Sequence, residues 1–318
     1  MVGVPAKRFL ALSVGLGFAL ASVGAVAARQ PVETGRPTIY MPPRGNAHNL
    51  RPTRSKQLTY HGGVGGYGVD TGADKVYLVF WGSQWNGNDP SREAAILQSF
   101  FSGVGGSPWN NSVTQYCQGV ASGTVTCGTN GTHATNPSGV LAGVWGDNAA
   151  PATAHPSQSQ LAAEAVRAAA HFGNTGAGSN NTVQYVIATA TGNSASGFGT
   201  QYCAWHSSTS SSYGNIAYTN MPYITDAGAS CGANFNGLGA NAGITIVGGH
   251  EFAETETDIF PNGGWLDGSG AENGDKCAWI SSGQGASAYT SLSTGTFPVQ
   301  SLWSNAFNSN QGGCVLSY

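Results

Sequence analysis

All six cysteines of this 318-residue chain lie between positions 117 and 314, behind an N-terminal segment that has the order of a secretion signal. Lys7 and Arg8 precede an apolar run over residues 9–26, which ends among small alanines. This order is typical of a signal peptide, which we place at residues 1–28. The run is short for a membrane span and rich in Gly and Ala, and no later segment is apolar enough to cross a bilayer. We therefore expect a secreted protein that has no membrane contact after signal cleavage.

An even number of cysteines in an exported chain predicts disulfides, which would stabilise the fold. Six cysteines allow fifteen connectivities. We expect pairing in sequence order, which joins Cys117 to Cys127, Cys203 to Cys231 and Cys277 to Cys314. The alternative for Cys203 is a metal role, because it forms a C-x-x-H pattern with His206. An oxidising compartment favours the disulfide, which leaves His206 as a structural or substrate-contacting residue.

The composition predicts a loop-rich body behind a basic leader. Only 8% of the residues are charged and 48 are glycine, which favours many turns and long polar loops. Residues 29–57 carry five prolines and six basic residues, and we interpret them as a leader, either a flexible arm or a pro-segment lying across the body. Residues 58–318 suffice for one large domain. They hold four basic and fourteen acidic residues, a balance that argues against nucleic acid as the partner.

Hydrophobic patterns in this body predict several strands. The run over 75–82 is β-branched and aromatic, as in a buried strand. Further strands are expected at 183–190, 215–224 and 244–247, with edge strands at 297–304 and 314–318. Helices are expected at 91–104, with Ser91 as N-cap, and at 157–173, where Ser157 and Gln160 match a capping box. The predicted class is α/β or α+β: a single disulfide-stabilised domain with a mixed sheet, a few helices and long Gly-rich loops.

The stretch HEFAETETD at 250–258 is the clearest candidate for chemistry, because four of its nine residues are acidic in a chain poor in charge. His250 and Glu254 are four apart, so on a helix both project from one face. This spacing matches the H-E-x-x-H zinc motif with a carboxylate as second ligand. In that motif the middle glutamate, here Glu251, is the general base that takes a proton from water.

A third metal ligand has to come from elsewhere. Seven of the fourteen body acids lie between positions 251 and 275, a like-charge concentration that is self-repulsive unless it is exposed or neutralised by a cation. Asp275 is our first choice and Asp258, two turns after His250, is the second. Glu272 is expected to orient His250 by contacting its imidazole and not the metal. His61, in a glycine-rich turn, is either a residue facing the site or an ordinary turn histidine.

The competing interpretation of HEFAE is the solvated face of a helix, and the preceding Gly248 and Gly249 disfavour a helix there. The nature of the metal is also open. One divalent ion is expected, with zinc as the first choice, although one histidine and two carboxylates form a harder ligand set than most zinc sites. Calcium is the alternative, because DGSGAENGD at 267–275 is rich in oxygen ligands.

Several motifs together resemble a family of secreted proteins. They are LTYHGG (58–63), KVYLVFWGSQW (75–85), FFSGVGGSPW (100–109), YCAWHSS (202–208), GHEFAE (249–254) and GAENGDKCAW (270–279). The chain is similar, over about residues 58–318, to bacterial HExxE-containing proteins related to the plant EXORDIUM, or phosphate-induced protein, family. The family pattern places T-D-P after the glutamates, whereas Ile259 and Phe260 separate Asp258 from Pro261 here. The resemblance implies that the protein is secreted and shares the fold of this family more directly than it implies a catalytic activity.

These features predict a secreted metal-dependent hydrolase, a metallopeptidase that acts on a peptide or protein. In this hypothesis His250 and Glu254 hold the metal and Glu251 is the base. The alternative is a non-catalytic, EXORDIUM-like extracellular protein that binds cell-wall polysaccharide through exposed Trp and Tyr residues. In that case the acidic cluster is structural and holds calcium or no metal.

Overall fold

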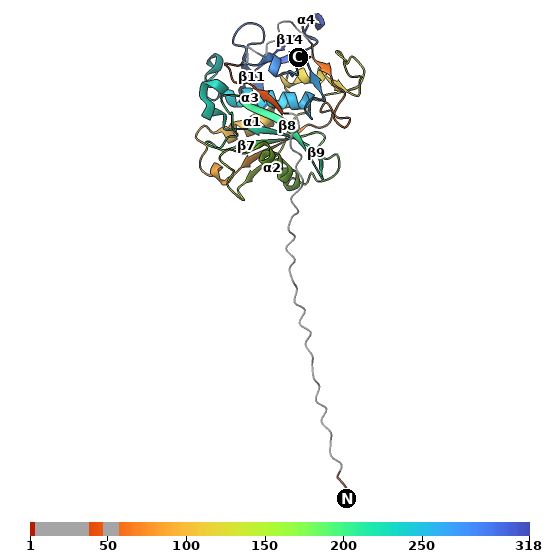
Figure 1. The fold of residues 1–318 in the computed structure, drawn as a ribbon, viewed down its shortest axis with the longest axis vertical. Coiled ribbons are helices and arrows are strands. Elements are labelled where there is room, and N and C mark those ends of the chain that lie inside the picture. The colour runs from red at the N-terminus through yellow and green to blue at the C-terminus, as the bar shows by residue number, and fades with distance from the viewer. Residues whose placement is uncertain (4–37, 47–56) are drawn as a thin grey trace.

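The computed structural model describes residues 1–3, 38–46 and 57–318 (Figure 1). A six-stranded mixed sheet, in the order β1-β8-β9-β7-β3-β6, forms the centre of a single α/β domain. Its strands are β1 (Thr38–Met41), β3 (Lys75–Trp81), β6 (Leu141–Asp147), β7 (Val183–Thr189), β8 (Ala204–Ser211) and β9 (Gly214–Met221). Strands β6, β3, β7 and β9 are mutually parallel, and β8 and β1 add antiparallel at one edge. The predicted fold class is therefore confirmed.

The surroundings of strand β3 explain the continuous apolar run in its sequence. Alternate residues of KVYLVFW enter two different apolar clusters: Leu78 packs with the cluster that contains α3, and Val79 with the one that contains α2. A parallel strand covered by helices on both faces has to be apolar on both faces, which explains the continuous run. The expected strands at 183–190 and 215–224 are confirmed as β7 and β9.

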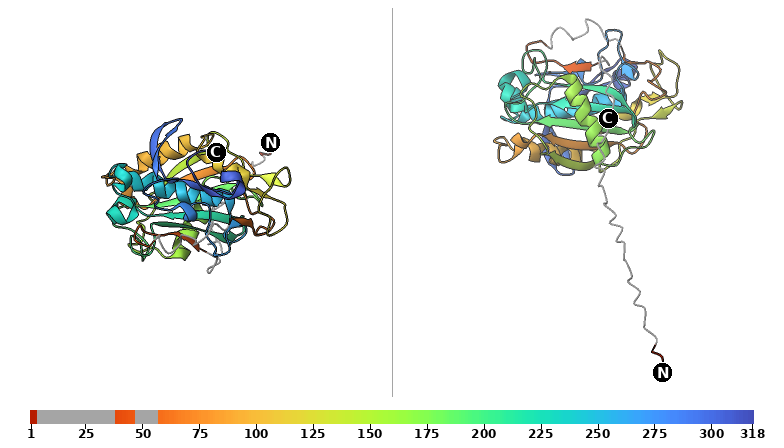
Figure 2. Two further views of the ribbon diagram at one scale, coloured as in Figure 1. Left: turned by 90° about the horizontal axis from the view of Figure 1, so that it is seen from above. Right: turned by 60° about the horizontal axis from the view of Figure 1, so that its bottom comes forward.

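Helices cover both faces of the sheet, so the domain has three layers (Figure 2). Of the described α-helices, α2 (Gln158–His171) lies on one face, whereas α1 (Glu93–Val104) and α3 (Ala242–Thr257) lie on the other. A further short helix, α4 (Phe307–Asn310), lies near the C-terminus. The capping box of α2 is confirmed, because the Ser157 side chain accepts from the Gln160 amide and the Gln160 side chain accepts from the Ser157 amide.

Helix α1 is confirmed, but its expected N-cap is wrong. Ser91 Oγ instead lies 2.9 Å from Thr225 Oγ1. Asp89 provides the cap, because its two carboxylate oxygens accept from the amides of Glu93 at 2.7 Å and Ala94 at 3.2 Å. A carboxylate satisfies two of the free N–H groups of the first turn and suits the positive end of the helix dipole, which a serine hydroxyl does less well.

Residues 244–247, expected as a strand, are part of α3, so that prediction is wrong. Every residue of α3 is buried, and a helix enclosed on all sides has no polar stripe by which its sequence could be recognised. The glycines before His250 do not end the helix. At Gly249 a Cβ atom would come within 3.1 Å of Phe100 and 3.2 Å of Trp109, so its absence lets two aromatic rings approach α3.

The edge strands expected at 297–304 and 314–318 do not join the main sheet, so that prediction is wrong; the strands outside the main sheet form small separate sheets. The paired strands are β11 (Ala288–Leu292) with β12 (Gly295–Val299), β13 (Leu302–Ser304) with β14 (Gly313–Val315), β10 (Trp265–Leu266) with β2 (Thr59–Tyr60), and β4 (Cys117–Gln118) with β5 (Thr132–His133). All four pairs are antiparallel. Of these described pairs, only that of β10 with β2 joins segments that are far apart in the sequence.

All three disulfides join cysteines in sequence order, as expected. The bonds are Cys117–Cys127, Cys203–Cys231 and Cys277–Cys314, and no described cysteine is free. They are compatible with an extracellular protein. None of the helices in the described ranges is long and apolar enough to cross a membrane.

Part of the segment 29–57, expected as a leader, belongs to the central sheet. Residues 38–41 form β1, which pairs with β8 so that Ile39 lies opposite His206. The backbone carbonyl of Pro42 accepts from Trp279 Nε1 at 2.6 Å. A domain boundary at residue 58 therefore leaves out one strand of the sheet. Residues 4–37 and 47–56, which include most of the expected signal segment and most of 29–57, lie outside the described residues.

Candidate metal centre

Helix α3 places His250 and Glu254 on one face, as their spacing predicts. His250 Nε2 lies 3.1 Å from Glu254 Oε1 and 3.8 Å from Asp275 Oδ1. These three residues form one of two groups with the geometry to hold a metal ion among the described residues. His250 and Glu254 are fully buried and Asp275 is 7% exposed, so the alternative of a solvated helix face is wrong. Asp275 also takes the place expected of the third ligand.

The loop that carries Asp275 is anchored to the helix through its backbone. The Asp275 amide donates to Glu254 Oε1 at 2.8 Å, at the start of a short helical turn, Asp275–Cys277. The preceding residue is Gly274, where a Cβ atom would lie 2.7 Å from His250 Nδ1 and 2.9 Å from Glu254 Oε1. A glycine is therefore needed for the loop to approach the two candidate ligands this closely.

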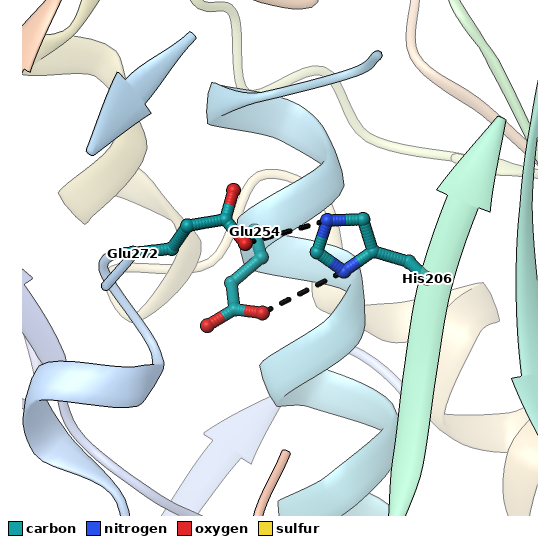
Figure 3. A group of neighbouring side chains, drawn as sticks. All are labelled: His206, Glu254 and Glu272. Carbon is teal, nitrogen blue, oxygen red and sulfur yellow. Dashed lines mark ion pairs between the residues drawn. The ribbon is translucent and has the colours of Figure 1, made fainter. Parts of the chain in front are cut away.

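A second group forms around His206, which projects from β8 toward α3 (Figure 3). His206 Nε2 lies 3.3 Å from Glu272 Oε2, and His206 Nδ1 lies 3.6 Å from Glu254 Oε2. The imidazole is therefore held between a carboxylate of the helix and one of the loop. Glu272 was expected to orient His250, but its ion pair is with His206. His206 itself was expected only as a structural or substrate-contacting residue.

Glu251, in the same helix as Glu254, contacts the same nitrogen of His206 more closely. Its Oε2 is 3.0 Å from His206 Nδ1, while its Oε1 is buried without a hydrogen-bond partner. A carboxylate on Nδ1 fixes the tautomer that carries the proton there and leaves Nε2 free to act as a metal ligand. His206 Nε2 has no hydrogen-bond partner, as this tautomer requires of a ligand atom.

His250 is held in the same way by Gln300, a residue that the sequence did not reveal. Gln300 Oε1 lies 3.2 Å from His250 Nδ1, and Gln300 Nε2 donates to the Gly274 carbonyl at 2.7 Å. The second contact fixes the orientation of the amide, so that its oxygen faces the imidazole. His250 Nε2 is buried and has no hydrogen-bond partner. Both imidazoles thus turn toward carboxylates an Nε2 that makes no hydrogen bond.

The electrostatics of the site favour a cation. Burial works to lower the pKa of His250, but the negative charge of Glu254, 3.1 Å away, raises that pKa to about 10. Burial, with the charge of Glu254, raises the pKa of both Glu272 and Asp275 well above the ordinary value. Such shifts show that the carboxylates repel one another and attract positive charge, whether it is a proton or a metal ion.

Besides Glu251, three candidate residues lie outside both groups. Asp258 accepts from the amides of residues 262, 263 and 264 at 2.6–2.9 Å, so its carboxylate is occupied in holding a turn. His61 is exposed, with its ring 3.4 Å from Thr59 Oγ1. Asp267, at the start of the expected calcium loop, pairs with Lys276 at 3.0 Å and accepts from Ser269 and Ala271. The oxygens of Asp267 are therefore satisfied within the loop.

The donor set itself is two imidazoles and three carboxylates, all buried, with Glu251 as a fourth carboxylate beside them. Imidazole with carboxylate suits zinc and neighbouring transition metals better than calcium, which prefers oxygen ligands alone. Searches with the chain found no matching protein-family model, curated protein or solved structure. The function is therefore inferred from these residues and their geometry.

Proposed function

We propose that this protein is an exported metal-dependent hydrolase that cleaves a peptide bond, in line with its resemblance to secreted HExxE-containing proteins. The observation that carries the proposal is the position of Glu251. It lies in α3 between His250 and Glu254, and one of its oxygens is buried without a hydrogen-bond partner. A carboxylate held beside a candidate metal site and left unsatisfied is suited to accept a proton during the reaction.

The residues divide the chemistry between them. A divalent ion bound here would supply a Lewis acid and lower the pKa of water. His250, Glu254 and Asp275 would hold it, and the enclosed surroundings would strengthen each electrostatic contact. Glu251 would accept the proton from water, while its second oxygen stays bonded to His206 Nδ1. Burial raises the pKa of Glu251 above its ordinary value, which brings its basicity nearer to that of a base working close to neutral pH.

The test is hydrolysis of casein and of a mixed peptide library by the exported, disulfide-bonded protein purified without chelator. We expect activity that chelation removes and that added metal restores. Glu251→Gln should lose it, because an amide cannot accept the proton. Glu256→Gln is the matched control: it makes the same change in the same helix, in a residue that bonds to Asn110 and lies outside both groups, and it should stay active. A chelation-resistant activity, or an active Glu251→Gln, would reject the proposal.

One observation favours a second candidate, an extracellular protein in which the metal is structural. The candidate ligands are almost completely enclosed, from 0% exposure for His250 to 7% for Asp275, as in closed structural metal sites. In this case removal of the metal lowers the unfolding temperature, and no peptide in the library is cleaved. Binding of the metal-loaded protein to insoluble cell-wall polysaccharide then tests the alternative, and exposed tyrosines such as Tyr67 and Tyr289 are available for it.

A further inference from the structure

The two candidate groups share a single residue, Glu254, and share it through different atoms. Glu254 Oε1 faces His250 Nε2 at 3.1 Å, whereas Glu254 Oε2 lies 3.6 Å from His206 Nδ1, within the group that His206 forms with Glu272. One carboxylate thus presents one oxygen to each histidine. This is the arrangement of a bridging carboxylate in two-metal sites, where the ions are about 3.5–4 Å apart.

Besides the shared Glu254, each half of the site has a histidine and a carboxylate of its own. Glu272 belongs only to the group of His206, and Asp275 only to the group of His250. Each histidine has its Nδ1 held by a hydrogen-bond acceptor, Glu251 in one case and Gln300 in the other. Each has a buried Nε2 that lacks a hydrogen-bond partner. A single ion at His250 would leave His206 Nε2 and Glu272 Oε2 facing each other 3.3 Å apart in the interior, and a buried ion pair of this kind is costly.

The charge of the site also fits two ions. Glu251, Glu254, Glu272 and Asp275 lie around the two imidazoles, and within the described ranges their ion pairs are all with those histidines. Lys276, which follows Asp275 directly, is engaged by Asp267. Two divalent cations match the charge of four carboxylates, whereas one leaves two buried negative charges that only protons could neutralise.

We propose that the site binds two divalent transition-metal ions, one on His206 and Glu272 and one on His250 and Asp275, with Glu254 as the bridge. This rests on the metal binding in the proposed function and extends it from one ion to two. A pair of ions can polarise a substrate oxygen and activate water at separate positions, as in aminopeptidases and other two-metal hydrolases.

The experiment is a metal count on the full exported chain. The protein is stripped with chelator, freed of it, loaded with Zn²⁺ or Mn²⁺ and desalted, and its bound metal per chain is measured by mass spectrometry. We expect two ions for the wild type, one for Glu272→Ala, one for Asp275→Ala and none tightly bound for Glu254→Ala. The exposed Asp226→Asn, which also removes one negative charge, is the control and should keep two.

A second measurement does not depend on variants. Two Mn²⁺ ions joined by a carboxylate are magnetically coupled, so the electron paramagnetic resonance spectrum of the Mn²⁺-loaded wild type should differ from that of isolated Mn²⁺. One ion per chain with an uncoupled spectrum would overturn the two-ion proposal while leaving the hydrolase proposal in place. Failure to bind Zn²⁺ or Mn²⁺ at all would overturn both.

Discussion

His206 Nδ1 and Glu251 Oε2 lie 3.0 Å apart, and this contact joins a strand of the central sheet to the helix that carries the other candidate ligands. It assigns the proton of the imidazole to Nδ1 and turns Nε2 toward Glu272. Glu251 therefore has two distinct functions to test: its Oε2 orients His206, and its unpartnered Oε1 is available as a base.

The two functions of Glu251 can be separated by two substitutions. Glu251→Gln keeps an oxygen that can accept from His206 Nδ1, so metal content should remain near that of the wild type while hydrolysis is lost. Glu251→Ala removes the acceptor as well, and the loss of such a contact typically weakens metal binding about 10–100-fold. Zinc affinities measured by competition with a chromophoric chelator check this. Equal affinities for the two variants would rule out the orienting function.

Gln300 should orient His250 as Glu251 orients His206, by accepting a hydrogen bond from Nδ1. Gln300→Leu has a similar size but cannot accept from Nδ1, so we expect metal affinity to fall about 10–100-fold. Gln284→Leu, in the same C-terminal part, removes only a bond to the Cys314 carbonyl and should bind metal normally. The same competition assay measures both. Unchanged affinity in Gln300→Leu would show that His250 needs no such partner.

Gly274 gives a steric test of the loop. In Gly274→Ala the new Cβ would lie 2.7 Å from His250 Nδ1, closer than packed atoms tolerate, so the loop has to move and metal affinity should fall at least tenfold. Gly248→Ala is the control in α3, because its Cβ would meet its neighbours at 3.5 Å, and alanine favours a helix by about 1 kcal/mol. The measurements are the metal affinity and the unfolding temperature of the two variants. A Gly274→Ala variant with full affinity would contradict the described approach of loop and helix.

Glu93 is buried away from the candidate metal centre, and we expect it to make the stability of the folded protein depend on pH. Burial, with the charges of Asp89 and Asp226, raises its pKa to about 8 from an ordinary 4.5, although the Ile224 amide donates to it. Between these pH values the folded protein keeps a proton that the unfolded chain has lost. Stability from this group is therefore full below pH 4.5 and falls as pH rises toward 8.

Glu93→Gln should remove that loss, because its amide has no proton to release. From pH 5 to pH 8 the free energy of unfolding of the variant should rise relative to the wild type by up to about 1.4 kcal/mol per pH unit. Urea unfolding of both proteins at several pH values measures it. Parallel curves for the two proteins would show that Glu93 titrates normally.

The sequence revealed the parts of the site that depend on local geometry. The spacing of His250 and Glu254 is enough to place them together, because the period of a helix is known in advance. Asp275 was identified from the concentration of acids, and it lies 3.8 Å from His250 Nε2 within one of the groups that could hold a metal ion. The strand predicted at 244–247 failed because β-branched residues favour strands only weakly, and burial of α3 on every side overrides that preference.

The remaining parts depend on topology and could not be seen locally. His206 reaches the site because β8 pairs with β9 and contacts α3. The order of strands in the sheet sets this placement. Its only signal was the C-x-x-H pattern, which pointed to Cys203, and that cysteine is bonded to Cys231. Gln300 follows β12 in an irregular segment, where an amide has no distinguishing sequence pattern.

The most direct test of the buried metal centre is anomalous X-ray diffraction, recorded on both sides of the zinc absorption edge from crystals of the exported protein loaded with zinc. We expect anomalous peaks about 2.0–2.1 Å from Nε2 of His250 and Nε2 of His206, with Glu254 between them. A single peak at His250, Glu254 and Asp275 would keep the metal centre and remove the second ion. Zinc bound only at surface histidines such as His61, with none at Glu254, would contradict the account.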